Sequence, residues 1–331
     1  MRRIMLWILT AGLVFALTAC AGGKPVAEQT PTQGTSAPTE FRICSLKGPT
    51  SMGLVKLLDD QKNGNTENRY ISNIVTGADE VTAALVSGKT DIAMLPANAA
   101  ATLYQKAGGF TVAAINTLGV LYVVENGDTV HSTEDLAGKT VCLTGKGTTP
   151  EYALRYLLAA HGIEDRVKLE FKSEPAEVVT VMTEDVAAVG LLPQPFAASA
   201  LMQNKTLRIA LDLTEEWTAV SADCPLVTGV TVVRSEIMEK YPAQVEAFLR
   251  EYAASVDYVN QNPAQAAVWI EELGIVGKAA IAENALPYCN LVCITGADMR
   301  TTLAGYLQTL YDRDPDAVGG AMPDEDFYFV K

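Results

Sequence analysis

Histidine is nearly absent from this chain of 331 residues, which contains only His131 and His161. Neither histidine has a second candidate ligand nearby, and no CxxC pair occurs, so the sequence predicts no metal site. Basic residues are also in the minority, because 25 Lys and Arg stand against 39 Asp and Glu, for a formal net charge of −14. Nucleic acid and anionic lipid both need a basic face, so this balance argues against either as a partner.

Aromatic residues make up only 7% of the chain, whereas alanine, valine and leucine are abundant, as is typical of α/β packing. No Ser-His-Asp triad and no pair of catalytic carboxylates is recognisable, so we expect no catalytic residues and no cofactor. The sequence therefore predicts a protein that binds a small molecule and is not an enzyme.

A long apolar run stands at the amino terminus. Arg2 and Arg3 precede an almost wholly apolar stretch, Ile4 to Ala16, and Leu17-Thr18-Ala19-Cys20 follows. This stretch is shorter than the roughly 20 apolar residues of a membrane span, so we expect residues 1–20 to be a secretory signal. Small residues before a cysteine resemble a bacterial lipobox, which predicts that Cys20 carries a diacyl lipid such as palmitate. The alternative is an ordinary signal peptide with an incidental Cys20.

Residues 21–39 contain one large apolar residue, Val26, among many Thr, Pro, Gly and Ala. Such a segment cannot bury enough apolar surface to fold, so we interpret it as a tether. The globular sequence begins near Glu40, and its length suits two lobes of ordinary domain size.

Five cysteines remain if Cys20 is lipidated, an odd number that leaves at least one unpaired within a monomer. Cys44 and Cys142 lie in apolar runs and are interpreted as small buried residues. Cys289 and Cys293 could pair in an exported protein, although a spacing of four is poor disulfide geometry within a helix.

Two stretches of the chain are near copies of each other. ADEVTAALVSGKTDIAMLPANAA (78–100) aligns without a gap with PAEVVTVMTEDVAAVGLLPQPFA (175–197), at a constant offset of 97 positions. Upstream of each lies a second matched pair, ICSLKGPTSMGLVKLL (43–58) and VCLTGKGTTPEYALRYLL (141–158). The matched order of strand, loop, helix, strand and loop predicts two related α/β lobes. Ligands bind such lobes at the carboxyl ends of the strands.

The glycine-containing loops lead directly into predicted helices, whose free N–H groups favour a polar acceptor. Glycine allows close backbone approach, and threonine and serine add hydroxyls. The candidate ligand residues in these loops are Gly48, Pro49, Thr50 and Ser51 in the first half, and Thr144, Gly147, Thr148 and Thr149 in the second. The alternative is that the hydroxyls only cap the helices.

The two Leu-Pro loops offer a second pair of contacts. Asn98 follows Pro96 and Ala97, and Gln194 stands between Pro193 and Pro195. Prolines hold the backbone before binding, which reduces the cost of ordering the amides. The alternative is that the prolines only end the strands.

Two apolar runs predict crossings between the lobes, which we expect to act as hinges. Phe110 to Val124 is apolar except for Thr111, Asn116 and Thr117, and Pro225 to Arg234 is rich in β-branched residues. We therefore assign 41–123 with 225–331 to the first lobe and 124–224 to the second. From Ser235 onward the apolar spacing predicts helices that brace the lobes.

A lipobox, a tether, GKTDIAMLP, VAAVGLLPQPFA, TLGVLYVV and GGAMPDEDFYF together resemble the substrate-binding proteins of ABC importers for nitrate, sulfonates, taurine and thiamine-precursor pyrimidines. The resemblance implies the type II periplasmic-binding-protein fold, with closure of both lobes around one ligand. By position, the family's pocket loops also include Met52 and Thr117. No arginine lies in these loops, although Lys47 and Lys146 flank them, so a small polar or heteroaromatic nutrient fits as well as a sulfonate.

The resemblance further implies a monomer that delivers its ligand to ABC permease subunits. It would be exported and held by lipid to the outer face of the bacterial cytoplasmic membrane, or facing the periplasm. Two alternatives remain. One is an enzyme like the thiamine-pyrimidine synthase, although its histidine and cysteine-rich motif are missing here. The other is a ligand-sensing lipoprotein coupled to a membrane receptor.

Overall fold

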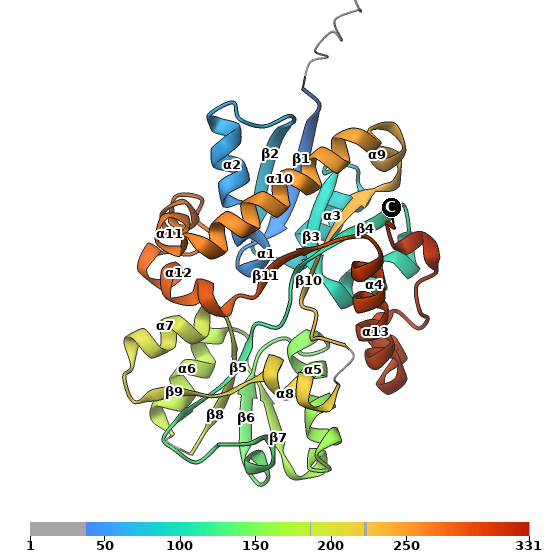
Figure 1. The fold of residues 1–331 in the computed structure, drawn as a ribbon. Helices are drawn as coiled ribbons and strands as arrows, with labels where there is room; N and C mark the ends of the chain where they lie inside the picture. The colour runs from blue at the N-terminus through green and yellow to red at the C-terminus, as the bar shows by residue number, and fades with distance from the viewer. Residues whose placement is uncertain (1–37, 186, 222–223, 331) are drawn as a thin grey trace, which may run out of the picture. The chain divides into compact units, whose positions relative to one another are not determined.

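The computed structural model describes residues 38–185, 187–221 and 224–330 (Figure 1). The predicted signal peptide, the lipidation site Cys20 and the tether up to residue 37 lie outside these residues. Within the described ranges, no helix combines the length and the apolar character needed to cross a bilayer.

The first sheet contains six strands in the order β11-β4-β10-β3-β1-β2. Their bounds are β1 (Glu40–Leu46), β2 (Arg69–Val75), β3 (Ile92–Pro96), β4 (Phe110–Thr117), β10 (Gly229–Arg234) and β11 (Leu291–Ile294). Strand β1 runs parallel to β2 and β3, whereas β10 is antiparallel to β3 and β4. We call this sheet and the helices packed on it the first lobe.

The second sheet contains five strands in the order β7-β6-β8-β5-β9. Their bounds are β5 (Leu121–Asn126), β6 (Thr140–Leu143), β7 (Lys168–Phe171), β8 (Val189–Pro193) and β9 (Leu207–Asp212). Strand β6 is parallel to β7 and β8, and β5 is antiparallel to β8 and β9. This sheet and its helices form the second lobe, which repeats the arrangement of β2, β1, β3, β10 and β4.

Each lobe receives its antiparallel strand from a segment that has just crossed between the sheets (Figure 1). The first crossing is residues 118–120, because β4 ends at Thr117 and β5 begins at Leu121. The predicted extended run from Phe110 to Val124 does pass from the first sheet to the second, but as two strands, β4 and β5, joined by residues 118–120, and the return crossing ends before Gly229. The strands extend up to the crossings because sheet pairing satisfies the backbone groups of these buried apolar residues.

Thirteen α-helices and five short 3₁₀ turns complete the described chain. In the first lobe they are α1 (Pro49–Met52), α2 (Val55–Lys62), α3 (Ala78–Val86), α4 (Ala97–Ala107), α9 (Ser235–Lys240), α10 (Pro242–Gln261), α11 (Pro263–Glu272), α12 (Ala279–Ala285), η3 (Leu286–Tyr288), α13 (Gly296–Arg313), η4 (Pro315–Val318) and η5 (Glu325–Phe327). In the second lobe they are η1 (Thr133–Leu136), α5 (Thr149–Ala160), η2 (Glu164–Arg166), α6 (Pro175–Glu184), α7 (Phe196–Gln203) and α8 (Leu213–Val220).

Helices α1 and α2 follow each other closely and are separated only by Gly53 and Leu54. The hydroxyl of Ser255, on α10, accepts from Leu57 N at 2.9 Å and donates to Gly53 O at 2.7 Å. It thereby takes the place of the i→i−4 bond between these two groups, which is a recognised cause of helix breaks. Ser255 is distant in sequence from Gly53 and Leu57, so the apolar spacing alone could not reveal the break between the helices.

Both faces of the central strands are buried, as expected where helices cover a sheet on both sides. Along β3, Ile92 and Met94 join the core cluster under α2, α10 and α11, whereas Ala93 and Leu95 join the one under α3, α4 and α13. The predicted C-terminal helices are present as α10 to α13, but β11 between them was not predicted.

Candidate functional site

The first predicted loop joins β1 to α1, and its hydroxyls bond back to the strand. Thr50 Oγ1 donates to Leu46 O at 3.1 Å, and Ser51 Oγ donates to Ser45 Oγ at 2.7 Å. Gly48 is the N-cap of α1, with φ of 120°, so neither hydroxyl is a cap. Side-chain bonds of this kind fix a loop before any ligand arrives.

The two other predicted residues of this loop, Pro49 and Met52, have different surroundings. Pro49 is half-buried at the first position of α1, and Met52 is fully buried with its Sδ 3.7 Å from Cys289 Sγ.

Cys289 and Cys293 are both free thiols, so the possible disulfide between them is not formed. Burial raises the pKa of Cys289 and, more moderately, that of Cys293, so both thiols are protonated near neutral pH.

The second predicted loop, between β6 and α5, is mostly exposed. Gly147 N donates to Glu151 Oε2 at 2.8 Å and Thr148 Oγ1 donates to Gly145 O at 2.6 Å, both on the exposed side of the loop. Thr144 is half-buried. Only Thr149, the first residue of α5, is buried, with 4% of its surface exposed.

Thr149 makes a direct contact between the two lobes. Its Oγ1 donates to Oδ1 of Asn98 at 3.2 Å, and Asn98 is 6% exposed. Asn98 lies in the first turn of α4, preceded by Pro96 as the N-cap, while Ala97 N donates to Thr228 O at 3.0 Å. The duplicated halves thus place one amide and one hydroxyl against each other at the carboxyl ends of their sheets.

Thr117 is the last residue of β4. Its hydrogen-bond partner Asn116 was not among the predicted residues. Thr117 Oγ1 donates to Asn116 Oδ1 at 2.9 Å, and Asn116 Nδ2 donates to Thr231 Oγ1 at 3.1 Å, all in fully buried positions. A Cβ on Gly229 would lie 2.4 Å from Asn116 Oδ1 and 2.8 Å from Thr50 Cγ2. These contacts bring the first loop, β4 and β10 together. The polar interruption of an apolar run was the signal that could have identified Asn116.

The loop after β8 holds Gln194 between two half-buried prolines, Pro193 and Pro195, with a cis peptide bond before Pro195. Gln194 is 2% exposed, and its Oε1 accepts from Ala198 N at 3.2 Å in the first turn of α7. Its Nε2 has no hydrogen-bond partner among the described residues. An amide N–H₂ can only donate, so this group requires an acceptor.

Several other buried polar atoms near the junction of the lobes also have no protein partner within the described ranges. They are Thr214 Oγ1, Thr228 Oγ1 and Tyr306 Oη. Burial raises the pKa of Tyr306, and the hydroxyl of Thr149 offsets part of this effect, which places Tyr306 of α13 beside the inter-lobe contact. Buried polar groups in folded proteins are normally bonded, so this concentration marks a place where a ligand can bond.

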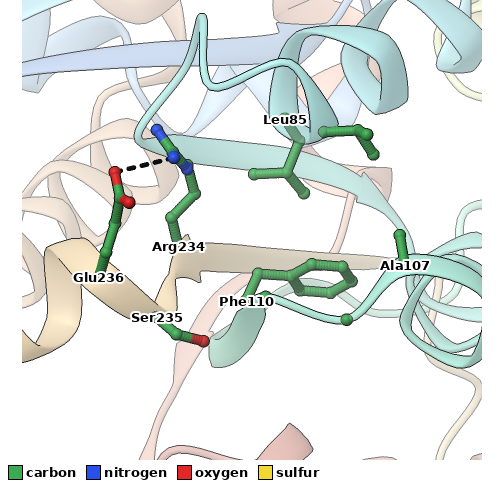
Figure 2. A pocket seen from close by; sticks show the side chains of 9 residues that line it. Leu85, Ala107, Phe110, Arg234, Ser235 and Glu236 are labelled. Carbon is green, nitrogen blue, oxygen red and sulfur yellow. Dashed lines mark ion pairs between the residues drawn. The ribbon is translucent and has the colours of Figure 1, made fainter.

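A cavity of about 300 Å³ lies elsewhere, at the far end of the first sheet (Figure 2). The guanidinium of Arg234 in this cavity is 2.8 Å from Glu236 Oε1 and donates to Gly88 O at 3.4 Å. Phe110 and Leu85 form its apolar side (Figure 2). None of the predicted ligand residues lines it, and its arginine is already paired, so we do not assign the ligand to this cavity.

The two histidines, which could act as acid or base catalysts, lie beside carboxylates outside the predicted loops. His161 Nδ1 lies 2.8 Å from Glu134 Oε1, and His131 Nε2 lies 3.6 Å from Asp128 Oδ1. The predicted ligand residues themselves carry hydroxyls, amides and one thioether. They can bind and orient a solute, but they include no group that titrates near neutral pH.

Comparison with known proteins gives a family and a fold. A family model described as menaquinone biosynthesis matches residues 49–290. An ABC transporter from Parabacteroides distasonis has a similar structure, with a TM-score of 0.75 and 26% identity over 88% of this chain and 99% of that one. The periplasmic aliphatic sulphonate binding protein of Escherichia coli has a TM-score of 0.69 and 14% identity over 89% and 96% of the two chains.

The alkanesulfonate-binding protein of Xanthomonas axonopodis, solved with MOPS bound, has a TM-score of 0.64 and 12% identity over 88% of this chain and 97% of that one. No curated protein matches the sequence significantly. The likenesses confirm the predicted two-lobed periplasmic-binding-protein fold with two crossings.

Proposed function

Because the chain belongs to the menaquinone biosynthesis family and has the fold of ABC-importer binding proteins, we propose that it captures a small solute between its lobes and delivers it to an ABC import permease. Its neighbours in structure are described as transporters and binding proteins, and this supports a binding role. The protein is extracytoplasmic in this proposal. Cys20 carries its lipid, it acts as a monomer, and the membrane and the permease subunits are its partners.

The contact between Asn98 and Thr149 is the observation that carries this proposal. Asn98 lies in the first half of the duplicated sequence and Thr149 in the second half, so a solute that touches both gains contacts only when the lobes are together. A ligand shifts a conformational equilibrium only by its differential affinity for the two states. Contacts from two lobes to one solute supply that difference.

The ligand in this proposal is small, rich in oxygen, and neutral or singly anionic. Gln194 Nε2 requires an acceptor, and the hydroxyls of Thr228 and Tyr306 can donate or accept. The flanking Lys47 and Lys146 are exposed, and Lys146 lies 5.8 Å from the centre of the Phe171 ring. Without a buried cation, helix N-termini would supply the positive potential for an anionic oxygen. Small polar or heteroaromatic nutrients meet these requirements.

A thermal-shift screen of the mature protein tests this function, with sulfonates, nitrate, pyrimidines, flavins and aromatic carboxylates as the probes. A ligand at 100 times its Kd should stabilise the fold by about 2.7 kcal/mol. The variant Asn98→Ala should lose most of this stabilisation, whereas Thr148→Ala, in the exposed loop, should keep it. A hit that stabilises Asn98→Ala as strongly as the wild type would place the ligand elsewhere.

An enzymatic role is the second candidate, because the family is described as biosynthetic. The absence of a titrating group among the predicted ligand residues favours binding over catalysis. Mass spectrometry of each hit after incubation separates the two: an unchanged compound supports binding, and a converted one supports an enzyme. A sensing role would instead appear as a ligand-dependent complex with a membrane receptor and none with a permease.

A further inference from the structure

The first crossing is held to the first lobe by one residue, Asn290. The backbone O of Asn290 accepts from Leu118 N at 3.1 Å, and its side-chain Nδ2 donates to Gly119 O at 2.5 Å. Asn290 stands directly before β11, whose first residue pairs with Thr117. Asn290 therefore extends the hydrogen bonding past the end of β4 by two residues. Its backbone bonds Leu118, and its side chain bonds Gly119.

The next residue of the crossing is held by the other lobe. Val120 O accepts from Gln194 N at 3.0 Å, in the loop after β8. Leu118 and Gly119 thus belong to the first lobe by their hydrogen bonds, and Val120 belongs to the second. The link between Gly119 and Val120 is where the attachment changes from one lobe to the other.

Gly119 is tightly packed against its neighbours on one side. A Cβ there would lie 2.2 Å from Thr214 Oγ1 and 3.2 Å from Leu226 Cδ2, which belong to α8 and the return crossing. On the other side a cavity of about 320 Å³ is lined by Leu118 and Asn290 among others. The first crossing therefore has packed neighbours against which it can pivot and open space into which Leu118 can move.

Asn290 has φ of 45°, the one positive value for a non-glycine residue in the described ranges. Asparagine tolerates this left-handed conformation better than other side chains do. The conformation directs the side chain back onto the crossing, and an alanine there would be strained and would lack the amide. A second bond nearby, from Tyr122 Oη to Tyr288 O at 2.8 Å, ties β5 to the same segment.

We propose that Asn290 is a positioning residue for the lobes: it fixes Leu118 and Gly119 to the first lobe and so confines the pivot to the Gly119–Val120 link. The purpose that we give to Asn290 rests on the proposed lobe closure, but the hydrogen bonds that it makes do not. Removing the side-chain bond should free Gly119, whereas the backbone bond from Leu118 N to Asn290 O remains, and should widen the range of angles between the lobes.

Spin labels on ketone-bearing residues at Asn65 and Lys205, exposed positions in the first and second lobes, allow the inter-lobe distance to be measured without ligand. We expect Asn290→Gly, which tolerates positive φ but lacks the amide, to broaden the distance distribution at least twofold. Asn290→Asp should broaden it at least as much, because a carboxylate would face Gly119 O. Asn260→Ala is the matched control, since Asn260 Nδ2 lines the same cavity but donates to Leu291 O at 3.0 Å and not to the crossing.

An unchanged distribution in a folded Asn290→Gly protein would overturn the inference, as would equal broadening in Asn260→Ala. Far-UV circular dichroism confirms that each variant is folded. These distances are measured without solute, so the outcome is independent of the ligand screen. Failure of the screen would count against the proposed function and leave the assignment of the pivot intact.

Discussion

In the first lobe the loop after the leading strand is buried and bonded to that strand, whereas in the second lobe the equivalent loop is largely exposed. Thr50 and Ser51 bond to Leu46 and Ser45, but Thr148 is exposed and bonds only within its own loop. The strands around these loops nevertheless match, although the helix after the first loop is divided into α1 and α2 and α5 after the second loop is continuous. Duplication has kept the scaffold of both lobes while each loop has acquired its own surroundings.

A second difference lies after the matched strands β3 and β8. Helix α4 begins at Ala97, directly after β3, but α7 begins only after the intervening Gln194 and Pro195. At the offset of 97 positions, Asn98 therefore corresponds to Pro195. The two lobes do not present equivalent groups to a ligand, and the first lobe provides the amide that contacts the second.

Among the residues that the structure describes, each lobe also has one buried carboxylate, Asp91 in the first and Glu125 in the second, and removing either should have the largest effect on stability. Glu125 is the richer in bonds: it accepts from Thr129 N at 3.0 Å and from Val130 N at 3.2 Å, and it pairs with Arg208. Glu125→Ala should cost about 3 kcal/mol, because the buried Val130 N loses its acceptor and the half-buried Arg208 loses one of its carboxylate partners. Asp91→Ala, beside the more exposed Arg42, should cost less. Urea unfolding measures both values, and hydrogen exchange should show the loss mainly in the mutated lobe.

The same carboxylates predict a loss of stability in acid. Burial opposes the ionisation of Asp91 and Glu125, but the hydrogen bonds from Arg42 and from Thr129 and Val130 outweigh it, so that both pKa values are lowered. A carboxyl with a lowered pKa in the folded state stabilises the protein above its unfolded pKa of about 4 and loses this effect below it. Unfolding free energy should therefore fall as the pH drops below about 4, and less steeply in Glu125→Gln. An equal slope in that variant would contradict this assignment.

A smaller effect is expected where the lobes differ by one methyl group. Gly190 on β8 corresponds to Ala93 on β3, and a Cβ at Gly190 would lie 2.5 Å from Met182 Sδ and 2.8 Å from Val178 Cγ1. Gly190→Ala should destabilise the second lobe by about 1–3 kcal/mol through overpacking. Ala93→Gly in the first lobe should cost about 1 kcal/mol through chain entropy. Equal losses in urea unfolding would mean that α6 yields to the added methyl group.

The smallest effect tests the two adjacent threonines of the second loop. Thr149→Val keeps the side-chain shape but removes the bond to Asn98, and should weaken ligand binding by about 2- to 12-fold, the equivalent of 0.5–1.5 kcal/mol. Thr148→Ala removes only a bond within the exposed loop and should change the Kd less than twofold. Calorimetry with the ligand from the screen measures both. A larger effect at Thr148 would mean that the exposed loop folds over the solute.

Much of the scaffold could be predicted because its signals are local. The repeat at an offset of 97 positions gives α3 and α6 matching starts and gives β3 and β8 matching bounds, Ile92–Pro96 and Val189–Pro193. The break between α1 and α2 could not be predicted, because it depends on Ser255 from a distant helix. Strand β11 was missed for a similar reason: four residues pair with β4 only once the C-terminal helices are packed.

The candidate site likewise has parts that the sequence predicted and parts that only the structure revealed. The sequence by itself determined the loops, because glycine, proline and hydroxyl residues before a helix are a local pattern with a local physical cause. Only the tertiary structure decided that Thr149 is buried against Asn98 while Thr148 is exposed, that Asn116 supports Thr117, and that Asn290 holds the first crossing. These are contacts between segments far apart in the chain. Their geometry depends on how both sheets and the C-terminal helices pack, and no short stretch of sequence records it.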